Sequence, residues 1–393
     1  MNPQQKFETR AIRTQVEQTQ HQEHSTPLFL TSSFTFEDAE QMRARFAGED
    51  PGNIYSRFTN PNTQEFIDKM CLLEGAEDGF ATATGMSAIF TALAALLKAG
   101  DHILASRSLF GSTHSILTKW LPRWQISHTY VDVHGPAEWA RALTPQTKLI
   151  FVETPSNPGI DLIDLEWLGQ FAREHLLLLV VDNCFATPYL QQPIRFGADL
   201  VLHSATKYID GQGRVLGGMV VGKTELITEV RNFARATGPA LSPFNAWILS
   251  KSLETLAIRM DRHTENALKL ARWLEDHPDI NRVKYPFLPS HPQYAIAKKQ
   301  MKAGGGIVSC ELTGGLAQGR AFLDHIQLSS LTSNLGDSRT IVTHPASSTH
   351  AKLSEEDRLA VGITPGLLRI SVGLEHIDDI QRDIAQALEN LSL

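Results

Sequence analysis

Lys207 is the residue of this chain with the clearest capacity for covalent chemistry. It follows the hydroxyl side chains of Ser204 and Thr206, at the end of an apolar run that begins at Leu200. A lysine amine can form a Schiff base with an aldehyde cofactor, and hydroxyl groups and backbone amides can bind a phosphate on that cofactor. A solvated lysine after a strand is the alternative, and Ser-x-Thr-Lys alone favours that alternative.

A carboxylate at the end of the preceding apolar run strengthens the cofactor hypothesis. Residues 176–181 read Leu-Leu-Leu-Leu-Val-Val and stop at Asp182 and Asn183. A buried carboxylate can pair with a protonated pyridine nitrogen and so make the ring an electron sink. With Asp182 present, an aldehyde cofactor and a solvated Lys207 explain the pattern about equally well.

Length and composition favour a large folded domain together with a smaller one. The chain has 393 residues, of which 42% are apolar and 20% charged, a composition typical of folded globular proteins and not of disordered ones. Its 36 basic and 43 acidic residues give a net charge of −7 without any block of like charge. Because binding to nucleic acid needs clustered positive charge, we expect no nucleic-acid partner.

Cysteine usage and hydropathy favour the cytoplasm. Cys71, Cys184 and Cys310 are widely spaced and contain no Cys-x-x-Cys pair, which fits a reducing compartment. The N-terminus lacks the apolar core of a signal peptide, and the longest apolar runs have the length of strands. We therefore expect no association with a membrane.

Helical and strand patterns alternate from residue 61 onward. Such alternation predicts a mostly parallel sheet covered by helices, with ligands at the carboxyl ends of its strands. Asn157, Asp182, Ser204, Thr206 and Lys207 all lie at those predicted ends. The expected strands are 102–105, 126–133, 149–153, 176–181, 200–202 and 219–221, and the expected helices are 63–73, 88–98 and 165–174.

Two weaker signals for anion binding lie nearer the N-terminus. Gly85 stands where the helix containing residues 88–98 begins, so free backbone amides and the helix dipole can meet an anion there. Tyr55 and Arg57, two residues apart in an extended segment, point the same way and could reach one phosphate. They belong to residues 1–60, where the periodic apolar patterns are short. Such a segment cannot bury much apolar surface by itself, so we expect it to pack against another part of the protein. A plain turn explains each signal as well.

The C-terminal third has the pattern of a second, α+β domain. A helical pattern over residues 243–275 links it to the first domain, and strands at 307–312 and 367–372 alternate with helices at 316–325 and 377–391. Arg369 lies inside an apolar run, so it should be partly buried and needs an anionic partner, either a structural carboxylate or a substrate carboxylate. His344 and His350 lack further ligands at metal-binding spacing, and no metal site is expected.

Four segments together resemble the Cys/Met metabolism family of pyridoxal-phosphate enzymes over nearly the whole chain. They are Tyr55-Ser-Arg-Phe-Thr-Asn-Pro, Val181-Asp-Asn, Ser204-Ala-Thr-Lys-Tyr and Leu368-Arg-Ile-Ser-Val-Gly-Leu-Glu. The resemblance implies fold type I of the pyridoxal 5'-phosphate (PLP) dependent transferases, an α/β fold with a mostly parallel seven-stranded sheet covered by helices. It divides the chain into an N-terminal arm (1–60) on a neighbouring subunit, a large PLP-binding domain (61–250) and a smaller α+β domain (251–393).

The resemblance also implies a role for each matching residue. Lys207, Asp182 and Phe110 are the implied catalytic residues: Lys207 carries the cofactor and moves protons, Asp182 pairs with the ring nitrogen, and Phe110 stacks on the ring. The implied phosphate ligands, of which the last two come from another subunit, are Gly85, Met86, Ser204, Thr206, Tyr55 and Arg57. The implied substrate-binding residues are Arg369, Asn157 and Asn334, with Asn157 also near the cofactor. A homo-oligomer follows, usually a tetramer built from two dimers.

Departures from the family pattern help to choose among its reactions. Phe110 stands where many lyases and cystathionine synthases have tyrosine, so stacking is kept but a hydroxyl for proton transfer is lost. Asn334 stands where serine is frequent, and Cys184 where threonine is frequent. These positions are most similar to the branch that uses sulfide to convert O-succinyl-L-homoserine to L-homocysteine and succinate in methionine biosynthesis. Cystathionine γ-synthase, O-acetylhomoserine sulfhydrylase and methionine γ-lyase activities are the alternatives.

Overall fold

A seven-stranded sheet is the centre of the computed structural model, which describes residues 5–132, 135–352, 354–360 and 362–392. The strand order is β1-β7-β6-β5-β4-β2-β3. Strands β6, β5, β4, β2 and β3 run parallel, whereas β7 is antiparallel to both of its neighbours. The strands are β1 (Asp78–Thr82), β2 (His102–Ser106), β3 (Ser127–Val131), β4 (Thr147–Glu153), β5 (Leu178–Asp182), β6 (Leu200–Ser204) and β7 (Gly218–Gly222). The predicted mostly parallel sheet is confirmed.

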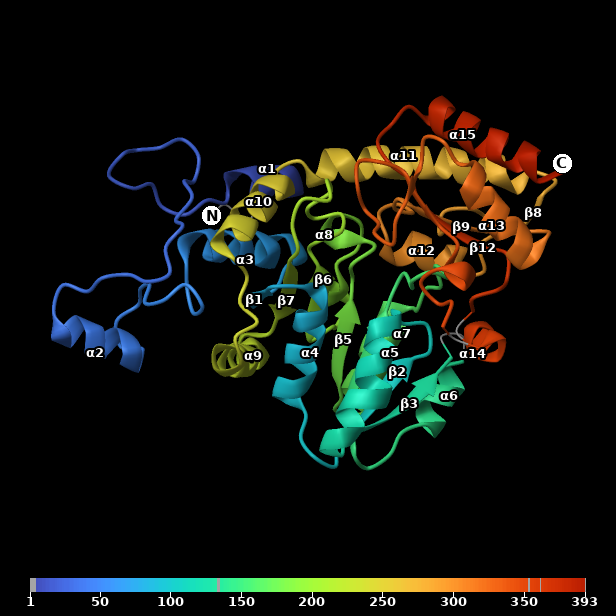
Figure 1. The fold of residues 1–393 in the computed structure, drawn as a ribbon. Helices are drawn as coiled ribbons and strands as arrows, with labels where there is room; N and C mark the ends of the chain where they lie inside the picture. Colours follow the sequence, from blue (N-terminus) through green and yellow to red (C-terminus); the bar gives the residue numbers. More distant parts are fainter. Residues whose placement is uncertain (1–4, 133–134, 353, 361, 393) are drawn as a thin grey trace.

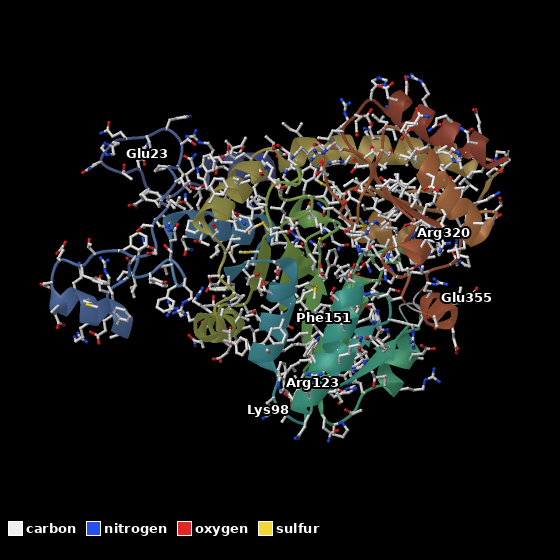
Figure 2. All side chains as sticks on the ribbon, in the orientation of Figure 1. Glu23, Lys98, Arg123, Phe151, Arg320 and Glu355 are labelled. Carbon is white, nitrogen blue, oxygen red and sulfur yellow. The ribbon has the colours of Figure 1, made fainter. Side chains whose placement is uncertain are left out.

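Helices cover both faces of this sheet (Figure 1). In β4, Leu149 and Phe151 point into one apolar core and Ile150 and Val152 into the other, which is why the strand is apolar throughout. Figure 2 shows Phe151 inside the molecule. One core includes α4 (Gly85–Leu96) and α9 (Thr224–Thr237). The other includes α3 (Pro61–Glu74), α7 (Leu165–Glu174), α8 (Thr187–Leu190) and α10 (Pro243–Leu253).

The C-terminal part contains a second sheet with its own core. Its strand order is β10-β11-β12-β9-β8, with every pair antiparallel except β10 with β11. The strands are β8 (Ile280–Lys284), β9 (Ile307–Leu312), β10 (Ser330–Leu331), β11 (Ile341–Thr343) and β12 (Leu367–Ser371). The helices here are α12 (Tyr294–Gln300), α13 (Gly315–His325), α14 (Glu355–Ala360) and α15 (Ile377–Glu389).

One long helix, α11 (Leu256–Glu275), joins the two parts. Its first turns place Leu256 and Met260 in the core of the large sheet, and its later turns place Leu270 and Leu274 in the core of the small sheet. Figure 1 shows α11 running across the top of both parts. A shared helix of this kind fixes the two sheets relative to one another.

Most of the N-terminal segment, including α2 (Ala39–Ala47), extends away from both sheets, whereas α1 (Phe7–Arg13) lies against the large part (Figure 1). Helix α1 packs on α3, and none of the residues of α2 is buried. The division of the chain at residues 60 and 250 stays a prediction. Across the described residues, no helix is both long enough and apolar enough to cross a bilayer.

The structure corrects the expected continuous helix over residues 243–275. The helix breaks at Glu254 and Thr255, where the amide of Thr255 bonds to the Ser252 carbonyl with a shorter spacing than in an α-helix. The same carbonyl accepts a bond from the Arg259 guanidinium, 2.9 Å away. The apolar pattern continues across the break, so periodicity alone could not reveal it.

Other differences concern strands at sheet edges and short connections. The expected strand 176–181 begins two residues later, because Leu176 has a positive φ of 55° and is 93% exposed. The edge strand β1 contains Gly79 and so lacks a continuous β-forming pattern. Strands β8, β10 and β11 were also not predicted, being short or polar. Part of the expected strand 126–133 lies outside the described residues.

Candidate active site

The candidate site lies at the carboxyl ends of β4, β5 and β6, as the alternating pattern predicted. In the register of the sheet, Glu153 at the end of β4 lies opposite Asp182 at the end of β5. Ser204 ends β6, and Lys207 follows it after one tight turn, in which its amide bonds to the Ser204 carbonyl. The topology thus gathers an amine, two carboxyl groups and a hydroxyl from separate parts of the chain.

The Lys207 amine is held by Asn334. Its Nζ donates a hydrogen bond to the Asn334 Oδ1 atom over 2.7 Å. Burial lowers the pKa of Lys207, and the positive charge of Arg369 acts in the same direction. Gly336 has a φ of 73°, and a Cβ atom there would lie 2.6 Å from the Tyr208 nitrogen. Only glycine therefore lets the turn that carries Asn334 rest directly on the lysine segment.

Asp182 is buried, and burial raises its pKa to about 6. Its Oδ1 atom accepts the amide of Cys184 over 3.0 Å, and the nearby His203 opposes part of the shift. Behind it, His203 bonds to Glu74 over 2.6 Å, and Asn183 donates to the same carboxylate over 3.0 Å. A buried carboxylate that resists ionisation gains stability from a cationic partner, so Asp182 fits a protonated pyridine nitrogen.

The start of α4 fits the phosphate of such a cofactor. The amides of Ser87 and Ala88 bond to Thr84, whereas those of Gly85 and Met86 have no acceptor among the described residues. A Cβ atom on Gly85 would lie 2.6 Å from the Ser204 Cβ atom, so glycine is what allows this helix to approach β6. Free amides at the positive end of a helix beside a hydroxyl form an anion site.

Thr206 is less available than the sequence suggested. Its hydroxyl is bonded to both backbone groups of Gly217, accepting from the nitrogen over 3.1 Å and donating to the oxygen over 3.3 Å. Its donor bond to the oxygen would have to be exchanged for one to a phosphate. In this structure, the main role of Thr206 is to fix the turn before β7.

Arg369 is buried without a carboxylate at ion-pair distance among the described residues. Its Nη1 atom donates to Asn157 Oδ1 over 3.1 Å and its Nη2 atom to the Asn334 carbonyl over 2.9 Å, while Nε has no partner in the described part. Burial lowers its pKa to about 10. Of the two sequence alternatives, a structural ion pair is therefore absent here, and the unpaired guanidinium is suited to an incoming carboxylate.

Phe110 is anchored by a residue that the sequence analysis did not single out. The Phe110 amide donates to Glu153 Oε2 over 2.8 Å, while the Phe110 ring is 41% exposed. Glu153 itself is buried, and burial together with the charge of Asp182 raises its pKa well above the usual value. The sequence did contain a signal for Glu153, because a carboxyl residue there ends an apolar strand, as Asp182 does.

Tyr55 and Arg57 are not brought to the site within this chain. Arg57 bonds through Nη1 to the Arg235 carbonyl in α9, and its Cζ atom lies 4.6 Å from the centre of the Phe58 ring. Tyr55 is 42% exposed. Their expected part in phosphate binding stays a prediction that depends on a second copy of the chain.

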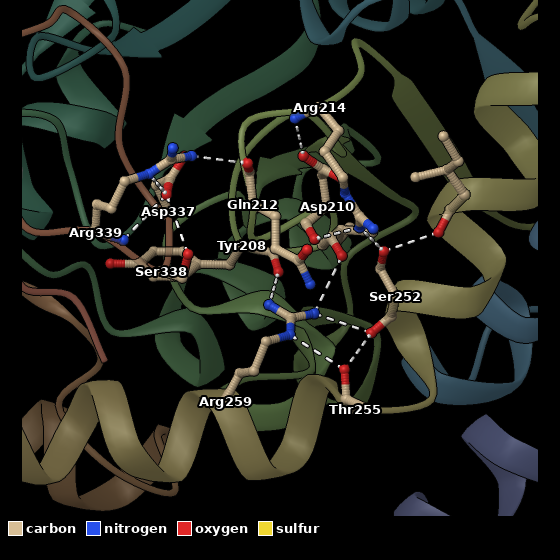
Figure 3. A network of polar contacts seen from close by, with 12 residues as sticks. Tyr208, Asp210, Gln212, Arg214, Ser252, Thr255, Arg259, Asp337, Ser338 and Arg339 are labelled. Atoms are coloured by element: carbon tan, nitrogen blue, oxygen red, sulfur yellow. Dashed lines mark hydrogen bonds and ion pairs between the residues drawn. The ribbon is translucent and has the colours of Figure 1, made fainter. Parts of the chain in front are cut away.

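A polar network supports the segment after Lys207 from behind (Figure 3). Arg259, from α11, donates to the carbonyl oxygens of Tyr208 over 2.6 Å and Ile209 over 3.2 Å. Arg339, paired with Asp337 over 2.9 Å, donates to the Gln212 carbonyl over 2.9 Å. Two guanidinium groups, one from the first turn of α11 and one from the loop between β10 and β11, thus fix the backbone next to the lysine.

The chain matches the model of the family described as Cys/Met metabolism PLP-dependent enzyme over residues 8–389. It is 50% identical to an O-succinylhomoserine sulfhydrylase of Pseudomonas aeruginosa, covering 98% of this chain and 96% of the relative. It is 43% identical to an L-methionine gamma-lyase of Porphyromonas gingivalis, covering 93% of each chain.

Solved structures agree with these matches. The crystal structure of metB from Corynebacterium glutamicum has a TM-score of 0.93 at 36% identity, covering 100% of both chains. A putative O-acetylhomoserine (thiol)-lyase (metY) from Campylobacter jejuni has a TM-score of 0.94 at 34% identity, covering 98% of this chain and 100% of its own, and carries a pyridoxyl-lysine phosphate at its position 205. With an amine, a carboxylate and an anion site of the required kinds at one sheet edge, this chain belongs to the Cys/Met metabolism family of enzymes, with fold type I and PLP as the cofactor.

Proposed function

We propose that this protein catalyses a γ-replacement that converts O-succinyl-L-homoserine and sulfide to L-homocysteine and succinate in methionine biosynthesis. The observation that carries the proposal is the sharing of Asn334 by two reactive groups. Lys207 bonds to its side chain and Arg369 to its backbone carbonyl. A carboxylate bound to Arg369 would therefore bring the adjacent Cα atom close to the Lys207 amine, as an α-amino acid substrate requires.

PLP, when bound, supplies the electron sink for proton removal at Cα and loss of the γ-substituent. Lys207 then acts as the base at Cα and moves a proton at Cβ from the same position. Its burial favours the neutral amine that such a base needs. Arg369 and Asn157 hold the substrate carboxylate, and the Phe110 ring covers the cofactor face.

Phe110 and the relatives favour sulfhydrylation over the other reactions of the family. Phenylalanine offers no hydroxyl for a tyrosine-dependent elimination, which weighs against methionine γ-lyase activity. The relatives named O-succinylhomoserine sulfhydrylase are more similar in sequence than those named L-methionine gamma-lyase. Cystathionine γ-synthase and O-acetylhomoserine sulfhydrylase activities differ only in the nucleophile or the leaving group, so substrate tests must separate them.

A product assay with the purified holoenzyme tests the proposal. O-succinyl-L-homoserine, O-acetyl-L-homoserine and L-methionine would each be offered alone, with sulfide and with L-cysteine. We expect homocysteine from the succinyl ester with sulfide at the highest kcat/KM. Cystathionine from L-cysteine, faster turnover of the acetyl ester, or 2-oxobutyrate from methionine as the main product would each identify one of the alternatives instead.

We further propose that residues 1–60 lie on a neighbouring copy of the chain, in a tetramer built from two dimers. The arm exposes Leu30 and Phe46, which are 70% and 59% accessible in the single chain, so apolar surface is available for a partner. Tyr55 and Arg57 then complete the phosphate site of that partner. Residues 61–250 and 251–393 form the large and small domains.

Complementation between inactive variants tests this sharing. Arg57→Ala and Lys207→Ala proteins would be unfolded, mixed in equal amounts and refolded together. If each site takes Arg57 from one chain and Lys207 from the other, mixed dimers contain one intact site, and about a quarter of the wild-type activity returns. If both residues serve the same site within one chain, no activity returns.

We place the reaction in the cytoplasm. Cys71, Cys184 and Cys310 are all free thiols, which fits a reducing compartment. Fractionation of cells followed by the sulfhydrylation assay would test this location, with activity expected in the cytosolic fraction and not in the membrane or extracellular fractions.

A further inference from the structure

Glu153 and Asp182 form a pair of buried carboxyl groups at one edge of the large sheet. They end neighbouring parallel strands and lie opposite one another in the register. Glu153 continues the alternation of Leu149 and Phe151, and Asp182 continues that of Val180, so both side chains face the same side of the sheet. Both are less than a tenth exposed.

Two neighbouring buried carboxyl groups cannot both ionise without a large cost, so their roles must differ. The negative charge of Asp182 adds to burial in raising the pKa of Glu153. For Asp182, burial is the main cause of the raised pKa, and both the Cys184 amide and His203 oppose it. The Phe110 and Asn157 backbone amides and the charge of Arg369 oppose the raised pKa of Glu153, which still stays well above the usual value, so Glu153 is the group of the pair that holds its proton more strongly.

The backbone contacts of Glu153 lead to two loops, while the charges of Asp182 and Arg369 act on it from nearby. Its Oε2 atom accepts the Phe110 amide over 2.8 Å, and the Asn157 backbone amide lies close enough to lower the pKa of its carboxyl group. Phe110 precedes the short helix α5 (Gly111–Ser115), which has no side-chain cap. Among the described residues, the Glu153 bond is the hydrogen bond that ties the Phe110 backbone to the sheet.

We propose that Glu153 is a positioning residue that holds the Phe110 ring and the Asn157 side chain in place beside the cofactor through their backbone amides. The proposal rests on the roles given to Phe110 and Asn157 under the proposed function. In this role Glu153 touches neither substrate nor cofactor, but it connects both loops to β4, the strand beside the one that ends at Asp182. Since an amide oxygen can accept the same bonds as a neutral carboxyl group, Gln should replace Glu153 well and Ala should not.

The test uses the holoenzyme without substrate. The first readout is the visible-region circular dichroism of the bound PLP, which reports the asymmetry of its surroundings. The second is the PLP dissociation constant. We expect Glu153→Ala and Phe110→Ala to change the dichroism in the same way, and Glu153→Ala to weaken PLP binding by about tenfold, as the loss of a buried hydrogen bond would. Glu153→Gln should keep the wild-type spectrum and the wild-type pH dependence of the visible band.

Asp383→Ala is a matched control for structural damage. Asp383 is a buried carboxyl group in α15 that accepts the amides of Gln327, Leu328 and Ser329, far from the site. We expect this variant to lower the melting temperature without changing the dichroism of PLP.

Three results would overturn the proposal. One is a Glu153→Ala spectrum equal to the wild type while Phe110→Ala changes it. Another is a Glu153→Gln variant with an altered spectrum or pH dependence, and this variant is informative even if Glu153→Ala does not fold. The third is an unchanged spectrum in Phe110→Ala, which would remove the premise about stacking. Because no substrate is used, failure of the proposed sulfhydrylation would be seen separately in the product assay.

Discussion

The Lys207 Nζ atom donates a hydrogen bond to the Asn334 side chain over 2.7 Å. The donor is the free amine, which is the form of Lys207 that transfers protons to and from a substrate. Asn334, which the family resemblance places among the substrate ligands, thus also holds the base.

Replacing Asn334 distinguishes these two roles. We expect Asn334→Ala to lower kcat by about tenfold with a smaller change in KM, because a single hydrogen bond to the base is lost. Steady-state kinetics with the succinyl ester and sulfide provide the measurement. Asn334→Ser keeps a short acceptor, so its kcat should lie between those of the wild type and Asn334→Ala. A raised KM at unchanged kcat would instead show that Asn334 acts by binding substrate.

Lys207→Ala should remove covalent attachment of the cofactor and reduce turnover by at least about a thousandfold, since both the nucleophile and the base are lost. Borohydride reduction followed by mass spectrometry measures the attachment. Lys223→Ala is the matched control, because Lys223 also follows a strand but pairs with Asp199 over 2.6 Å. Substantial turnover in the Lys207 variant would contradict its role, and loss of attachment in the Lys223 variant would show that the effect is not specific.

The sequence predicts the regular parts of the fold because their signals are local. The helix over 165–174 and the strand over 307–312 match α7 and β9 at both ends, since each has a clear apolar period, the helix between polar residues and the strand between glycine-rich turns. The interruption at Glu254 and Thr255 could not be predicted, because the apolar pattern is unchanged there. The break depends on neighbouring groups such as the Arg259 guanidinium, which bonds to the Ser252 carbonyl. The same guanidinium also bonds to the carbonyl of Tyr208, which is 51 positions away along the chain.

The candidate site follows the same division. Asp182, Ser204 and Lys207 could be placed at one edge because parallel strands end together. The bond between Lys207 and Asn334 joins residues 127 positions apart, and no sequence period reports such a contact. Glu153 was visible only as the last residue of a strand, and its importance appears once Phe110 and Asp182 lie beside it. Arg369 was predicted to be partly buried, but only the folded chain shows that it is almost fully buried and that no carboxylate of the described residues pairs with it.

Asp182 makes the stability of the cofactor-free protein depend on pH. Its pKa is raised to about 6 in the folded chain, against about 4 when unfolded, so the folded state holds the proton more tightly. The stability from this group is fully present below about pH 4 and is lost as the pH rises through 6, roughly 3 kcal/mol in all. Of this, about 1 kcal/mol should be lost between pH 5 and 7.5.

Urea unfolding of the wild-type apoprotein and Asp182→Asn at these two pH values measures this effect. The asparagine variant has no titrating carboxyl group at position 182. Raising the pH from 5 to 7.5 should therefore lower the unfolding free energy of the wild type relative to that of the variant by about 1 kcal/mol. Equal differences at both pH values would mean that Asp182 titrates normally. With PLP bound, the dependence should weaken, because the ring nitrogen provides the cationic partner that the buried carboxylate otherwise lacks.

Arg369→Lys should act mainly through KM. Lysine keeps the positive charge but loses the planar pair of donors that can hold a carboxylate while also bonding Asn157 and the Asn334 carbonyl. We expect kcat/KM for the succinyl ester to fall by about a hundredfold, mostly from a higher KM, which corresponds to roughly 3 kcal/mol of lost binding. Arg231→Lys is the control, because Arg231 pairs with Asp78 over 2.6 Å at the edge strand β1, and its kinetics should stay unchanged. A variant with a normal KM for the α-amino acid would place the carboxylate elsewhere, and it would also remove the argument that Lys207 and Arg369 act on the same substrate through Asn334.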